Sequence, residues 1–191
     1  MRLSSLAARA VAATLAMSAL LAGASARATV VVQLTRAQHA CQSSLVVRAS
    51  VADQRSLWNE DHSQIITLTR LRVTQYVRGT GPTELIVRQF GGRVGDLVSE
   101  VPGDGALLQG QDVVLFLRAG SGVVYLTALA QSVYLVVHSP GQPEMVRRTL
   151  HDLSFATQAN GRMTIVAPAS EPDETLDHLI ADVRGIAACT P

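Results

Sequence analysis

After residue 28, hydrophobic and polar side chains alternate along much of the chain with the period of two that is typical of β-strands. Residues 65–78 contain one such alternating series, and Arg70 and Arg72 fall on its opposite face, toward solvent. Residues 113–117 form a continuous apolar run between turn residues, which predicts a central, buried strand. The alternating series in residues 65–78 consists of Ile65, Thr67, Thr69, Leu71 and Val73.

Clusters of glycine and proline divide the rest of this region into short segments, as expected where tight turns join strands. Residues 52–63 are polar around the single tryptophan, and we expect a turn or a long hairpin loop there. Further strands are predicted at residues 44–51, 83–90, 123–129, 133–138, 144–149 and 163–166.

Two segments have a helical pattern instead. Residues 34–40 predict a short N-terminal helix. Residues 173–185 predict a C-terminal helix, with acidic residues in the first turn, Arg184 near the end and apolar residues on one face. The sequence therefore predicts a mainly β domain over residues 29–191, an OB-like antiparallel barrel or sandwich with two short flanking helices. The apolar face of the predicted C-terminal helix consists of Leu176, Leu179, Ile180 and Val183.

Residues 1–28 have the pattern of a secretory signal peptide: arginines, then an uncharged apolar run, then small residues. Cleavage is expected after Ala26 or Ala28, and the apolar run is shorter than the roughly 20 residues of a membrane-spanning helix. The sequence therefore predicts a secreted or periplasmic protein with no membrane span after cleavage. A membrane anchor at the N-terminus is the alternative interpretation.

Composition and charge exclude several classes of function. All 16 basic residues are arginines, so catalysis through a lysine Schiff base is excluded. Removal of residues 1–28 takes away three arginines and turns the formal charge from +1 to −2, which argues against nucleic acid as a partner. Neither a zinc-binding spacing of histidines and cysteines nor a nucleophile motif is present, so no metal, cofactor or catalytic residue is predicted.

Two cysteines, Cys41 and Cys189, lie near the two ends of the predicted domain. Export permits disulfide formation, and a bond between them would tie the termini together. Two free buried thiols are the main alternative. A reactive cysteine has no support, because the sequence contains no CxxC motif.

The order of several short motifs over residues 34–155 resembles a family of exported bacterial domains of unknown function. Trp58, Asp61, Ile65 and Thr67 match its W-x-x-D…I-x-T pattern, and an Arg-Gly pair, a Gly-Gly pair and residues 110–117 follow in the family's order. Gln111 stands where that family usually has glutamate. The pattern is more distantly similar to the OB-like barrels of netrin-type modules and metalloproteinase inhibitors. Those inhibitors reach the protease metal with an N-terminal cysteine, whereas Cys41 lies well inside this chain.

The candidate binding residues are Trp58, Asp61 and His62, which lie together in the polar segment. Carboxylates and imidazole bind cations, but a solvated hairpin turn with Asp61 making the turn hydrogen bonds is the alternative interpretation. We expect an exported, non-catalytic binding module for a protein or small ligand in the extracytoplasmic space. An inhibitor or accessory partner of a secreted protease, and a metal-dependent enzyme with a site near residues 58–62, are the alternatives.

Overall fold

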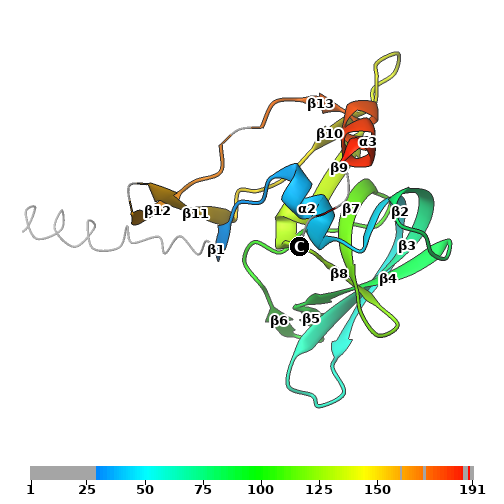
Figure 1. Ribbon diagram of the computed structural model, residues 1–191. Coiled ribbons are helices and arrows are strands. Elements are labelled where there is room, and N and C mark those ends of the chain that lie inside the picture. The colour runs from blue at the N-terminus through cyan, green and yellow to red at the C-terminus, as the bar shows by residue number, and fades with distance from the viewer. Residues whose placement is uncertain (1–28, 160, 170, 187–188, 190–191) are drawn as a thin grey trace, which may run out of the picture.

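A computed structural model describes residues 29–159, 161–169, 171–186 and 189. The predicted signal peptide and its cleavage sites lie outside the described residues. The fold is mainly β, and five strands close into a barrel, as Figure 1 shows. These strands are β2 (Leu45–Trp58), β3 (Ile65–Arg78), β4 (Glu84–Phe90), β7 (Asp112–Ala119) and β8 (Val124–Leu126).

The barrel closes through a Greek-key order of strands. Strand β2 pairs antiparallel with β3 and with β7, and β3 pairs antiparallel with β4. Strand β8 completes the ring because it pairs antiparallel with β7 and, at Val87 and Val124, parallel with β4. This arrangement confirms the predicted OB-like barrel.

The apolar run in β7 serves two cores, one on each face of the strand. Val113, Leu115 and Leu117 point into the barrel. Val114 and Phe116 point outward, into a second core that two helices cover. A strand that is buried on both faces needs apolar residues at every position, which explains why the run does not alternate.

The covering helices are α2 (Arg36–Gln42) and α3 (Leu176–Gly185). Thr35 caps α2 in a capping box with Gln38, and Thr175 caps α3. The predicted apolar face of α3 is buried against the sheet, and both predicted helices are confirmed within a few residues at their ends. The same sheet continues from β7 through β9 (Val133–Val137) and β10 (Met145–Arg147) to β13 (Glu174–Thr175).

Two smaller sheets extend from the barrel (Figure 1). The first packs one face on a small apolar cluster around Leu153 and Phe155, beside the 3-10 helix η1 (Leu129–Ser132). The second is a hairpin that follows β4 directly. The first sheet consists of β1 (Thr29–Val32), β11 (Leu153–Ala159) and β12 (Arg162–Val166), and the second of β5 (Gly92–Val94) and β6 (Leu97–Ser99).

The prediction of a loop over residues 52–63 is wrong for residues 52–58, because β2 continues to Trp58. Its polar side chains find partners across the ladder in β3. Arg70 donates to Asp53 over 2.8 Å, and the hydroxyls of Ser56 and Thr67 are 2.9 Å apart. Cross-strand polar pairs of this kind stabilise a strand that has little apolar surface to bury. Strands β1, β5, β6, β11 and β13 also lie outside the predicted strands.

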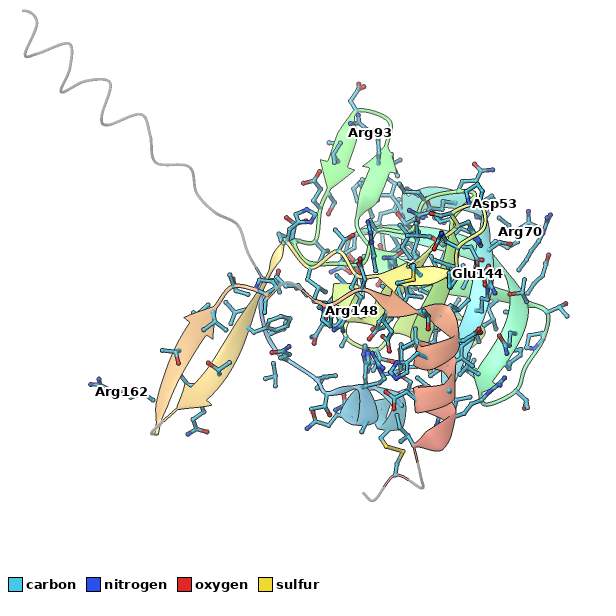
Figure 2. All side chains as sticks on the ribbon, turned by 90° about the horizontal axis from the view of Figure 1, so that it is seen from above. Asp53, Arg70, Arg93, Glu144, Arg148 and Arg162 are labelled. Atoms are coloured by element: carbon cyan, nitrogen blue, oxygen red, sulfur yellow. A yellow bond between two sulfur atoms is a disulfide. The ribbon has the colours of Figure 1, made fainter. Side chains whose placement is uncertain are left out.

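Cys41 and Cys189 form a disulfide with a Cα–Cα distance of 5.3 Å, which ties the end of α2 to the segment after α3. Figure 2 shows the bond beyond the ends of the two helices. The predicted pairing of these cysteines is therefore present in the structure. Among the described residues, no helix combines the length and the apolar character needed to cross a membrane.

Candidate functional site

An apolar cavity of about 500 Å3 lies where the β2–β3 ribbon meets the β5–β6 hairpin. Figure 1 shows this hairpin beside the turn that joins β2 to β3. We call this cavity and its rim the Trp58 groove. It is lined by Trp58, Ser63, Gln64, Ile65, Phe90, Gly91, Leu97, Val98, Ser99 and Val101.

The position of Trp58 is set by a turn whose hydrogen bonds converge on Asn59. Trp58 is the last residue of β2 and pairs with Ile65. The side-chain oxygen of Asn59 accepts from the amides of Ser63 and Gln64 over 2.9 and 3.1 Å. His62 takes the left-handed backbone conformation, with φ 54°, and its ring stacks on the indole with centroids 6.5 Å apart. The turn therefore holds one flat side of the indole against His62.

The opposite wall is held by a close approach of the hairpin to the ribbon. The amide of Gly91 donates to the carbonyl of Ile65 over 2.8 Å, and the Thr67 hydroxyl donates to the carbonyl of Gly91 over 2.8 Å. Gly92 has φ 126°, and a Cβ there would collide with Ser56 and Thr67. Because neither the conformation nor the space admits a side chain, glycine at position 92 is what lets the hairpin close the groove.

The rim of the groove exposes large apolar side chains. Phe90 is 51% exposed and Leu97 is 58% exposed, and Val98 and Val101 are exposed beside them. Exposed apolar side chains that gather around one cavity are typical of interaction sites. In addition, β6 pairs with β5 along one edge, and no other described strand pairs with its second edge. The groove therefore offers both apolar surface and open backbone hydrogen-bonding groups.

The three predicted binding residues have different positions. Trp58 lines the groove, and His62 lies behind it against the indole. Asp61 is exposed in the turn and forms no hydrogen bond or ion pair with another described residue. The turn hydrogen bonds that we considered for Asp61 come from Asn59 instead. Asp53 binds Arg70 on the β2–β3 ribbon, and Figure 2 shows these two residues close together. Asp53 and Asp61 therefore do not converge on one point.

A polar cluster that the sequence did not reveal lies at the other end of the sheet. The Arg48 guanidinium donates to Asp112 over 2.6 Å and to Glu144 over 2.7 Å. The two ring nitrogens of His138 lie 3.2 Å from Asp112 and 3.0 Å from Glu144. Arg48, and to a smaller extent His138, hold the pKa of Glu144 below its usual range. Asp112, His138 and Glu144 have the ligand types and spacing of a metal site, but Arg48 already neutralises the carboxylates.

A larger cavity, of about 1160 Å3, lies beneath the segment that leads from β12 to β13. Its residues come from positions 36, 134, 146–148, 150, 151, 167–169, 171–175 and 178, so no local motif marks it in the sequence. It contains Arg148, a mostly buried cation.

Comparison with known proteins adds no assignment. No protein-family model matches the sequence, and no curated protein sequence matches it. The function is therefore inferred from the residues of the chain themselves.

Proposed function

We propose that this chain is an exported, non-catalytic binding module whose Trp58 groove takes an extended, apolar segment of a partner protein. The observation that carries the proposal is the cavity of about 500 Å3 with exposed Phe90, Leu97 and Val98 on its rim. Burial of this surface by a partner would gain roughly 25 cal/mol for each Å2 of apolar area removed from water.

The open edge of β6 favours an extended peptide over a small molecule. A peptide that adds to a sheet edge gains backbone hydrogen bonds, and its alternate side chains point into adjacent pockets. The groove lies directly beside Leu97–Ser99, so a strand added to β6 would bring one apolar side chain over Trp58.

Export is supported by the signal-peptide pattern of residues 1–28 and by the disulfide between Cys41 and Cys189, a bond typical of oxidising compartments. The order of motifs over residues 34–155 and the OB-like barrel support, as part of the same proposal, membership of the exported domain family that the sequence resembles.

Because Trp58 is the single tryptophan, the groove carries its own fluorescent probe. We expect the apolar dye 8-anilinonaphthalene-1-sulfonate to bind there and to accept energy from the excited indole. Val98→Asp places a charge in the groove and is expected to weaken dye binding at least tenfold. Leu108→Asp is the matched control, because Leu108 is 59% exposed and does not line the groove. Equal loss of energy transfer in both variants, or in neither, would contradict the proposal.

A further inference from the structure

The cavity of about 1160 Å3 is separate from the Trp58 groove and shares none of its lining residues. It lies between the β9–β10 part of the sheet, the start of α3 and residues 167–169 and 171–173, which lead to β13 (Figure 1). Apolar walls come from Val146, Leu150 and Pro172. A cavity of this size with a few convergent polar groups is typical of a ligand site.

Arg148 is the most deeply buried of the charged side chains that line the cavity. Its side chain is 12% exposed, and Figure 2 shows it beside the segment that leads to β13. The guanidinium lies 4.9 Å from the centre of the Tyr134 ring, and Nη1 donates to the carbonyl of Gln131 over 3.3 Å. A cation in this position needs an anion, because burial removes the water that would otherwise solvate it.

Among the described residues, Glu171 is the carboxylate that Arg148 binds, and Nε donates to it over 2.6 Å. Glu171 belongs to the connecting segment and not to a strand or helix. No backbone hydrogen bond joins residues 167–169 or 171–173 to another described part of the molecule. The partner of the buried cation is therefore supplied by a segment with little attachment of its own.

Arg36, another arginine that lines the cavity, is held in a different way. It binds Glu174 through two nitrogens, over 2.8 and 2.6 Å, and Asp182 over 2.6 Å. Both acids belong to elements with regular hydrogen bonding, β13 and α3. Arg147 also lines the cavity and pairs with Asp173, but its side chain is 62% exposed. Arg148 is therefore the buried arginine whose anionic partner can be exchanged without the loss of a strand or a helix.

Tyr134 adds a second polar group. Its side chain lines the cavity, lies against Arg148, and its hydroxyl forms no hydrogen bond with another described residue. A phenol donates readily to a carboxylate, so an incoming carboxylate could bind Arg148 through paired hydrogen bonds and Tyr134 through a third.

From this arrangement we propose that the cavity binds a ligand carboxylate on Arg148, in the place that the Glu171 carboxylate occupies in the structure. Glu171 is then a resident competitor for the site. An intramolecular competitor has a high effective concentration, so it lowers the apparent affinity for any free carboxylate.

The test uses succinate as the probe and isothermal titration calorimetry as the measurement. Glu171→Gln keeps the shape of the competitor but removes its charge, so we expect succinate to bind at least tenfold more tightly than to the parent chain. Asp173→Asn is the matched control: Asp173 lies on the same segment and lines the cavity, but its ion pair is with exposed Arg147. This control is expected to bind succinate as the parent chain does. The neutral analogue succinamide is expected to bind neither variant.

A second pair of variants tests the role of Arg148. In the Glu171→Gln background, Arg148→Met is expected to abolish succinate binding. If that variant does not fold, Arg148→Lys keeps the charge but cannot form paired hydrogen bonds, and at least tenfold weaker binding is expected. Succinate binding that does not tighten in Glu171→Gln, or that persists unchanged in the Arg148 variants, would overturn the proposal.

Discussion

The fold gives single side chains chemical properties that the sequence alone does not predict. His39 is 1% exposed, stacks on Phe116 with ring centroids 4.4 Å apart, and lies 3.0 Å from the Ser132 hydroxyl. Burial, and to a smaller extent the charge of Arg148, lower the pKa of His39 to about 4. The imidazole is therefore neutral in the folded protein throughout the neutral pH range, and it serves packing.

This pKa predicts a loss of stability in acid. Below about pH 6.5 the unfolded chain binds a proton at His39 while the folded chain does not, so the free energy of unfolding falls between about pH 6.5 and 4. The full effect is on the order of 3 kcal/mol. His39→Gln removes it, so we expect the stability difference between the parent chain and this variant to shrink on acidification. Denaturant titrations at pH 7 and 4.5 measure the free energies of unfolding of the parent chain and the variant. A difference between the two proteins that is the same at both pH values would contradict the lowered pKa of His39.

Arg48 is expected to stabilise the fold by joining β2 to the first residue of β7 and to the residue before β10. Arg48→Met leaves Asp112 and Glu144 facing each other without their shared cation, and we expect a loss of about 2 kcal/mol. Arg72→Met is the control, because Arg72 is exposed and forms no ion pair with another described residue. Urea denaturation measures both variants, and equal losses would show that the cluster contributes nothing of its own.

At this scale, the sequence identified Trp58 but not its neighbours in space. Tryptophan stands out in a polar segment, whereas the hairpin residues Leu97 and Val98 become part of the site through tertiary contact. Arg148 and Glu171 are likewise 23 positions apart, with no motif to connect them.

Helices and strands were predicted best where one face is buried, because burial of one face gives the apolar residues a regular spacing along the chain. The spacing of Leu176, Leu179, Ile180 and Val183 predicted α3 because one face of that helix is buried. Residues 52–58 were missed because their side chains are polar and their stabilisation comes from partners in β3, which a single-segment pattern does not contain. Strand β11 was missed because Leu153 and Phe155 bury one face over a short, mixed segment.

The packing of α3 on the sheet makes a direct prediction. Leu179 is 0% exposed, so Leu179→Ala is expected to lower the free energy of unfolding by about 3 kcal/mol, through lost burial and the cavity left behind. Leu108→Ala makes the same chemical change at a 59% exposed position and should cost less than about 0.5 kcal/mol. Thermal or urea unfolding distinguishes the two, and similar losses would contradict the observed packing.

The disulfide connects elements that are 148 positions apart in the chain. The chain-entropy treatment gives a closed loop of this length about 5 kcal/mol of stabilisation. We therefore expect the Cys41→Ser/Cys189→Ser double variant to unfold at a clearly lower urea concentration than the parent chain. Mass spectrometry after alkylation without reduction should find no free thiol, and two alkylated cysteines would refute the bond.

For the molecule as a whole, the sequence predicted the OB-like barrel but not the contact that closes it. The barrel closes where short β8 pairs with β4 at a single position, Val87 with Val124, and no local pattern shows that contact. Each of the two cavities is walled by segments that lie apart in the chain, so no local pattern shows them either. The two sites share no lining residue, so we expect Val98→Asp to leave succinate binding unchanged and Glu171→Gln to leave dye binding unchanged.

The central claim is that the Trp58 groove binds an extended apolar peptide. Its most direct test is to select peptides from a random displayed library on the folded chain, and to titrate them while the emission of Trp58 is recorded. The account predicts peptides with shared apolar residues that shift the emission on binding. It also predicts that they bind Val98→Asp at least tenfold more weakly and Leu108→Asp unchanged. Peptides that bind Val98→Asp as well as the parent chain, with no change in emission, would contradict it.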